Sequence, residues 1–138
     1  MKLVLDNNVL FSIMNPESVA TYLFSLIRVE FFAPEFIKLE LIKYEEECLF
    51  ESKLSEHEFE IRQIEVEESI KFFKESKYDD MLTKAMMNLP DPKDSPYLAL
   101  ALSINALIWS NDPHLRGQSL VPVFTTADLL KMFLNNEI

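Results

Sequence analysis

The chain has 138 residues, of which 49% are hydrophobic, so it can bury a core and is not disordered. Its 23 acidic and 13 basic residues give a net charge of −10, which argues against broad nonspecific binding to nucleic acid through Lys and Arg. No apolar run approaches the ~20 residues of a membrane helix. The single cysteine, Cys48, cannot form an intramolecular disulfide, which fits the reducing cytosol, so we expect a cytoplasmic protein.

The first half of the chain alternates short apolar runs with helical patterns. In chain order it predicts a strand at Lys2–Leu5 ended by polar residues, a helix at Val19–Ile27, a strand at Glu30–Ala33, an amphipathic helix at Phe36–Cys48, a helix from the Ser55/Glu58 capping box to about Glu68, and a strand at Ile70–Phe73.

The second half continues the alternation. It predicts a helix at Ser76–Asn88, a loop at Leu89–Lys93, a helix at Pro96–Ile104 capped by Asp94 or Ser95 and ended by Asn105, strands at Leu107–Ser110 and Val121–Phe124, and a last helix from Thr125 or Thr126 to about Asn135. Such alternation predicts an α/β fold, a three-layer sandwich with helices on both faces of a mainly parallel sheet. We find no linker or repeat, and expect one domain over residues 1–138.

Three acidic residues lie where such a sheet would place a ligand. In open α/β sheets, ligands bind outside the carboxyl ends of the strands. Asp6 follows the first strand directly, Asp112 follows the Leu107–Ser110 strand after one residue, and Asp94 opens the helix that leads into that strand. We therefore expect these three carboxylates to share one cleft.

A fourth acid comes from the helix predicted at Phe36–Cys48. Glu40 lies at the flank of its apolar stripe, where a buried charge needs a partner; Glu47 lies near the same angle and is a weaker candidate. Converging carboxylates repel one another, and a hard divalent cation such as Mg²⁺ or Mn²⁺ relieves that repulsion. A metal held in this way suits phosphodiester hydrolysis.

Each of these acids also has a purely structural explanation. Asp6 could end a strand, Asp94 could be a helix N-cap, Asp112 could be a turn residue before proline, and Glu40 could pair with Lys43. Only their joint placement favours a site. His57 and His114 have no second His or Cys at ligand spacing and are expected on the surface, whereas Cys48 and Trp109 are expected in the core.

Four segments resemble the motifs of PIN domains, and they occur in the family's order. Asp6–Ser12 resembles the opening segment, Ala33–Leu41 the segment with the second acid, Asp91–Leu102 the central segment, and Trp109–Asp112 the strand-end motif of a hydroxyl residue followed two places later by Asp. The resemblance spans essentially the full chain. It implies a PIN fold and a metal-dependent ribonuclease, using Mg²⁺ or Mn²⁺.

By this resemblance, Asp6, Asp94, Asp112 and Glu40 are the catalytic and metal-holding residues, supported by hydrogen bonds from Asn8 and Ser110. Asp91 is an alternative, auxiliary ligand. Many small members of the family are VapC-like toxins of toxin–antitoxin pairs, often dimeric, so RNA is the expected substrate and an antitoxin a candidate partner. The sequence departs from the family at Asn7, often a small hydroxyl residue, and in a polar insert from about Ser52 to Glu68.

Two other functions remain open from the sequence. The net negative charge is also consistent with a catalytically silent PIN-fold protein that binds or scaffolds another protein. A receiver-type signalling domain fits less well, because it needs a paired acid at the first strand end and an Asp ending a central strand. A homodimer is predicted from apolar residues that a domain of this size need not bury fully: Phe31, Phe32, Phe50 and Phe59.

Overall fold

The computed structural model describes all 138 residues and contains one five-stranded sheet. Every neighbouring pair of strands is parallel, in the order β3-β2-β1-β4-β5. The strands are β1 (Lys2–Leu5), β2 (Glu30–Pro34), β3 (Ile70–Phe73), β4 (Leu107–Trp109) and β5 (Val123–Phe124). The expected α/β sandwich is therefore confirmed, with a sheet that is parallel throughout.

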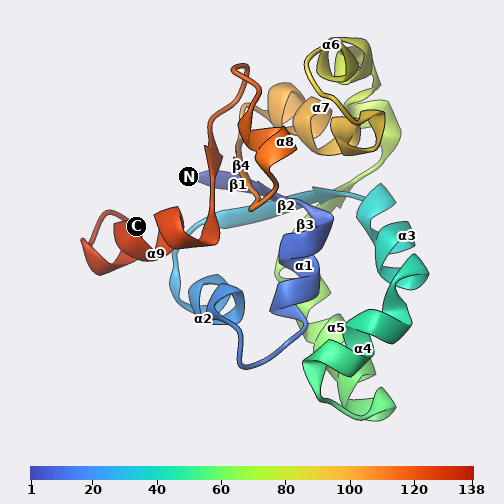
Figure 1. Ribbon diagram of the computed structural model, residues 1–138, viewed down its shortest axis with the longest axis vertical. Helices are drawn as coiled ribbons and strands as arrows, with labels where there is room; N and C mark the ends of the chain where they lie inside the picture. Colours follow the sequence, from blue (N-terminus) through green and yellow to red (C-terminus); the bar gives the residue numbers. More distant parts are fainter.

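Nine α-helices surround this sheet. They are α1 (Asn7–Ile13), α2 (Val19–Leu26), α3 (Phe36–Lys43), α4 (Glu45–Ser52), α5 (Glu56–Glu68), α6 (Leu82–Met87), α7 (Ser95–Ile104), α8 (Pro113–Arg116) and α9 (Thr126–Leu134). In Figure 1, α6 and α7 lie above the sheet, and α1, α2 and α5 lie below it. Because both faces are covered, β1 is a continuous apolar run in which Leu3, Val4 and Leu5 are fully buried.

The order of the strands determines where a ligand would sit. The chain builds β1, β2 and β3 towards one edge, then crosses back over α7 to place β4 on the other side of β1. Such a reversal leaves a crevice at the carboxyl ends of the two central strands. Leu5 of β1 pairs with Trp109 of β4, so the next residues of the two strands, Asp6 and Ser110, emerge side by side.

Several local predictions are confirmed by hydrogen bonds at helix ends. Ser55 and Glu58 form the predicted capping box at the start of α5, and Thr125 caps α9 in the same way with Asp128. Asn105 ends α7 with φ of 55°, a left-handed conformation that Asn tolerates better than most residues.

The single helix predicted at Phe36–Cys48 is wrong, because the helix breaks at Tyr44. This residue has φ of −109° and ψ of 21°, and its ring packs against Phe11 with centroids 5.9 Å apart. The next helix, α4, begins with three consecutive Glu residues, which are favourable near the partial positive charge of a helix N-terminus. The break lets Cys48 turn inward, and it is buried as expected.

One helix was not predicted, and one helical prediction needs correction. The polar residues that end β1 also begin α1: Asp6 caps this helix, accepting a hydrogen bond from the Val9 amide at 2.8 Å. The helix predicted at Ser76–Asn88 is confined to α6 and preceded by two 3₁₀ turns. Between them Tyr78 has φ of −128° and is only 3% exposed, so burial of its ring interrupts the helix.

The aromatic residues from which a dimer was predicted are mostly buried. Phe31, Phe32 and Phe59 belong to the core, and only Phe50 is exposed. The prediction of a homodimer therefore loses most of its basis. None of the helices is long and apolar enough to cross a bilayer.

Candidate active site

The centre of the site is the junction of β1 and β4. The carboxylate of Asp6 is 1% exposed; one oxygen accepts the Val9 amide and the other accepts the Ser110 hydroxyl. The Ser110 hydroxyl in turn accepts the amide of Asp112 at 3.0 Å. Ser110 therefore links the end of β1 to the loop that carries Asp112, because the register of β1 and β4 places Ser110 beside Asp6.

Asp112 begins a short helix that the sequence did not predict. Its Oδ1 accepts the His114 amide at 2.9 Å, and Pro113 occupies the first helical position, which suits its fixed φ. Its carboxylate also lies near that of Asp94: one ligand atom from each of Asp94, Asp112 and His114 falls within 4.8 Å of the others. The structure thus brings two distant acids together, as predicted, and adds a histidine that was expected only on the surface.

Asp94 stands at the start of α7 without acting as a cap. Its side chain makes no cap hydrogen bond, whereas Asp91 accepts the Lys93 amide at 2.9 Å and forms the preceding turn. The structural explanation for Asp94 therefore fails, because both of its carboxylate oxygens are without a partner in the protein. Asp91 already accepts a hydrogen bond within this turn, so it is a weaker candidate than Asp94 for a metal ligand.

Glu40 joins the cluster from α3 through an amide. The side chain of Asn7 donates a hydrogen bond to Glu40 Oε2 at 3.5 Å, and no cation pairs with this carboxylate. Asn8, predicted to support the site, is exposed, and its side chain makes no hydrogen bond. Because Asn7 and Asn8 are adjacent on α1, the sequence alone gave little basis for choosing between them.

The electrostatics of the cluster show that it holds unbalanced negative charge. Burial raises the pKa of Asp6 to about 6, the Ser110 and Val9 hydrogen bonds oppose this rise, and the charges of Asp112 and Asp94 add to it. Burial likewise raises the pKa of Asp94 to about 6, aided by repulsion from Asp112. No Lys or Arg side chain lies within 4 Å of these carboxylates, and the ring of His114 is the one basic group at that range, with Nδ1 3.9 Å from Asp112 Oδ1.

A tyrosine that the sequence analysis did not single out completes the site. Tyr97 lies one turn after Asp94 on α7 and is 1% exposed, yet its hydroxyl has no hydrogen-bond partner. Burial raises its pKa, and the carboxylates of Asp6 and Glu40 raise it further, which places the phenol beside the cluster. A buried hydroxyl without a partner is rare in folded proteins, and one reason for it is a ligand that the hydroxyl contacts.

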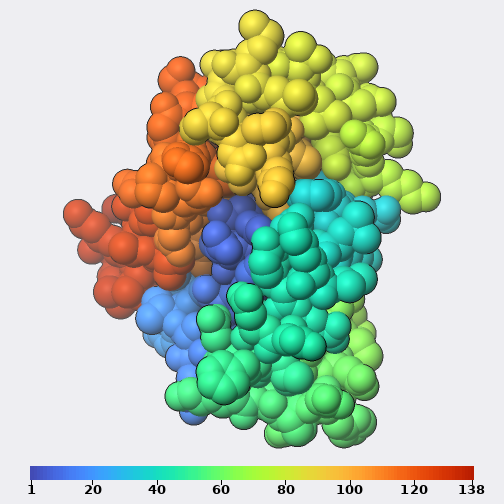
Figure 2. All heavy atoms as spheres, turned by 45° about the vertical axis from the view of Figure 1, so that its right-hand side comes forward, coloured from blue at the N-terminus to red at the C-terminus, as the bar shows by residue number.

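The surface of this region is hollowed. In Figure 2 the dark blue atoms of the first residues lie in a hollow between the orange, yellow and teal parts of the chain, which contain α8, the start of α7, and α3. A groove of about 510 Å³ begins beside this point and follows α1 and α4. It is lined by Asn7, Asn8, Phe11, Ser12, Tyr44, Glu47, Cys48 and Glu51.

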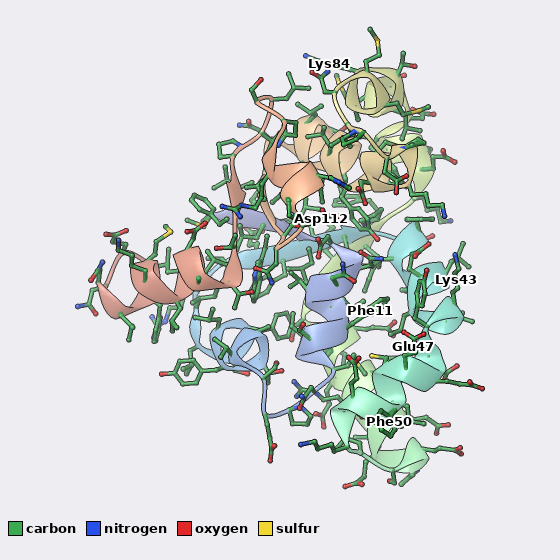
Figure 3. All side chains as sticks on the ribbon, in the orientation of Figure 1. Phe11, Lys43, Glu47, Phe50, Lys84 and Asp112 are labelled. Carbon is green, nitrogen blue, oxygen red and sulfur yellow. The ribbon has the colours of Figure 1, made fainter.

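Glu47, the weaker candidate for the fourth acid, belongs to this groove and not to the cluster. Figure 3 shows Asp112 near the ends of the central strands, whereas Glu47 lies lower, on α4, close to Phe11. Cys48 lines the same groove, but burial and the charges of Glu51 and Glu45 raise its pKa to about 11. A thiol with such a pKa is a poor nucleophile.

The donors of the cluster are chemically suited to a hard divalent cation. They are carboxylate oxygens, several without a partner, and repulsion among them is what a bound cation would relieve. Asp6 and Asp94 come from different elements, so only the folded chain brings this donor set together.

Comparison with known proteins bears on the fold of the chain. The family model described as PIN domain matches residues 4–130. A solved chain of a toxin-antitoxin complex from Klebsiella pneumoniae superposes with a TM-score of 0.68 over 90% of this chain and 97% of that chain, at 10% sequence identity. At this identity the likeness concerns the fold alone. No curated protein matches the sequence.

Proposed function

Because the chain belongs to the PIN domain family, we propose that it is a metal-dependent endoribonuclease that hydrolyses RNA phosphodiester bonds. The observation that carries the proposal is the convergence of Asp6, Asp94 and Asp112 at the carboxyl ends of β1 and β4, with Glu40 beside them. No lysine or arginine forms an ion pair with any of the four.

The four carboxylates would hold Mg²⁺ or Mn²⁺, both of which accept oxygen ligands. When bound, such an ion activates water and neutralises charge on the phosphate. Asp6 is the most rigid of the donors, because the Val9 amide and the Ser110 hydroxyl fix its two oxygens. The Asp94 side chain makes no hydrogen bond within the protein, so its free oxygens can orient the attacking water.

The supporting residues keep these donors in place. Ser110 fixes the position of Asp6 relative to the Asp112 loop, and Asn7 holds Glu40 towards the cluster. In the mechanism proposed here, Asn7 therefore takes the supporting role that the sequence suggested for Asn8. Lys93 and Arg116 lie in the segments next to Asp94 and Asp112, are exposed, and can contact the phosphates of a short RNA.

The biological setting we propose is that of a toxin with an antitoxin partner. The structural neighbour comes from a toxin-antitoxin complex, and the two folds match over almost the whole of both chains. A protein that cleaves RNA needs restraint until it is required, and a tightly bound partner supplies it. Expression of the chain alone should then arrest growth, and Asp94→Asn should remove that effect.

The direct test is a cleavage assay on purified protein. A labelled single-stranded RNA is incubated with Mn²⁺ or Mg²⁺, and with a chelator, using wild type, Asp94→Asn and the matched control Glu47→Gln. We expect metal-dependent cleavage by wild type and Glu47→Gln only. Equal cleavage by Asp94→Asn would show that the activity does not come from this cluster.

A second function is favoured by one observation, the net charge of −10. A PIN fold that has lost catalysis could serve as a binding or scaffold protein, and a negative surface suits a basic protein partner better than RNA. Failure of wild type to cleave any RNA while still binding a basic partner in a salt-dependent manner would favour this alternative.

A further inference from the structure

His114 stands at the edge of the carboxylate cluster in a fixed backbone position. Its amide donates to Asp112 Oδ1 at 2.9 Å, so the residue after Pro113 is tied to one of the acids itself. Its ring nitrogen Nδ1 lies 3.9 Å from the same oxygen. This distance is too long for a hydrogen bond, and it leaves the imidazole facing the cluster without being bound to it.

The ligand atoms around His114 are otherwise unused. The imidazole makes no hydrogen bond to any residue, Asp94 has two free oxygens, and Asp112 retains its Oδ2. One atom from each of the three residues falls within 4.8 Å of the others. A cation among them would therefore require only small side-chain rotations, and it would break no existing side-chain hydrogen bond.

An independent observation points to a ligand at the carboxylate cluster to which Asp94 belongs. The hydroxyl of Tyr97 is buried and has no partner, one turn along α7 from Asp94. Leaving a buried hydroxyl unsatisfied costs about 1–3 kcal/mol. A water molecule or phosphate oxygen held by a cation at Asp94 would provide the partner that this hydroxyl lacks.

We propose that His114 supplies a nitrogen ligand to the cation held by Asp94 and Asp112, and that the site therefore selects Mn²⁺ over Mg²⁺. This inference rests on the proposed function, which requires a divalent cation at the carboxylates but is satisfied by either ion. Mg²⁺ is bound almost entirely by oxygen, whereas imidazole nitrogen is a common ligand of transition metals.

The high exposure of His114, 62% of its side chain, is compatible with this role. The orange part of the chain, which contains α8 and therefore His114, borders the hollow in Figure 2, so a ligand supplied by this helix stays accessible to solvent. Asp94 and Asp112 are both partly buried and would bind the inner side of the ion. Removal of His114 should consequently disturb the fold little.

The test measures metal binding and the atoms that contact the metal. Mn²⁺ and Mg²⁺ are titrated separately by calorimetry into wild type, His114→Ala, Asp94→Asn and the matched control His57→Ala, which removes the other, exposed histidine on α5. Pulsed electron paramagnetic resonance on the Mn²⁺-loaded samples detects nitrogen bound directly to the ion. Thermal unfolding of each metal-free variant checks that it is folded.

We expect a directly bound nitrogen in wild type and His57→Ala, and none in His114→Ala. Mn²⁺ affinity of His114→Ala should fall by more than about tenfold, the lower limit for loss of groups that merely support a ligand. Its Mg²⁺ affinity should change less than about twofold, because Mg²⁺ relies on oxygen.

Two results would overturn the inference, and they differ in what they say of the proposed function. Unchanged Mn²⁺ binding in His114→Ala, with binding lost in Asp94→Asn, refutes the nitrogen ligand and leaves the carboxylate metal site intact. No binding of either ion to wild type refutes both.

Discussion

Two regions of this molecule are rich in carboxylates, and they differ in how the fold assembles them. The cluster at the strand ends takes Asp6, Glu40, Asp94 and Asp112 from four separate segments and partly buries them. The run on α4, Glu45, Glu46, Glu47 and Glu51, comes from one helix, and all four are exposed. Convergence and burial, rather than the density of acids along the sequence, therefore distinguish a site from a solvated surface.

Neutralising one acid in each region should produce the largest difference between the two regions. Asp94→Asn should reduce RNA cleavage by more than about 100-fold, because loss of a metal ligand exceeds the effect of losing a supporting group. Glu47→Gln should stay within about twofold of wild type, because its side chain is exposed in the groove. Initial rates at saturating Mn²⁺ measure both, and equal losses in the two variants would erase the distinction.

Asp6 differs from the exposed acids of α4, because its buried charge should lower the stability of the metal-free protein. Asp6→Asn keeps polar atoms that can hydrogen-bond to the Val9 amide and the Ser110 hydroxyl. It removes the negative charge of a buried carboxyl group whose pKa is about 6. The metal-free variant should therefore be more stable than wild type at pH 7 by about 3 kcal/mol, given the rise of the Asp6 pKa from 3.8 to about 6 and 1.36 kcal/mol per pKa unit. Urea unfolding in the presence of a chelator measures this difference.

The matched control is Glu46→Gln, an exposed residue of the α4 run. Its stability should stay within about 0.5 kcal/mol of wild type. If Asp6→Asn were destabilised instead, the carboxylate would be contributing to the fold more than its burial costs.

The pH dependence of stability should report the same cost. The pKa values of Asp6 and Asp94 are raised from 3.8 to about 6, so the folded chain takes up these protons at a higher pH than the unfolded chain. Stability of the metal-free protein should accordingly rise as pH falls from 7 to 5, with a contribution of about 1 kcal/mol from Asp6 alone. Asp6→Asn should show a smaller rise in the same urea experiments, and an identical rise would contradict the raised pKa.

The smallest expected effect concerns Tyr97. Tyr97→Phe removes a buried hydroxyl that has no partner, so the metal-free protein should gain about 1 kcal/mol, the lower end of the cost of an unsatisfied buried hydroxyl. If the hydroxyl contacts a group held by the metal, the same variant should show a smaller stabilisation on addition of Mn²⁺ than wild type. Thermal unfolding with and without Mn²⁺ measures both quantities, and a destabilised metal-free variant would mean that the hydroxyl has a partner.

The sequence was most informative where a local pattern decides the structure. The buried strand Lys2–Leu5 and the Ser55/Glu58 capping box depend on neighbouring residues, and the structure matches both. It also indicated that Asp6, Asp94 and Asp112 would meet, because parallel strands end at one edge of a sheet. Asp94 and Asp112 lie near each other, and Ser110 connects Asp6 to the Asp112 loop.

The features that the sequence did not predict depend on contacts between distant segments. At the break the ring of Tyr44 packs against Phe11, a residue of α1, and the choice of Asn7 over Asn8 depends on where α3 places Glu40. Tyr97 resembled an ordinary core residue, since only the structure shows that its hydroxyl has no partner. The proximity of His114 to Asp94 is likewise a long-range contact without a spacing signal in the sequence.

The position of the metal site at the strand ends is tested most directly by calorimetric titration of Mn²⁺ into three proteins: wild type, Asp94→Asn and Glu47→Gln. We predict saturable binding in wild type and Glu47→Gln, and its loss in Asp94→Asn. Binding that survives in Asp94→Asn but disappears in Glu47→Gln would place the metal in the α4 groove and contradict the assignment of the site to the strand ends.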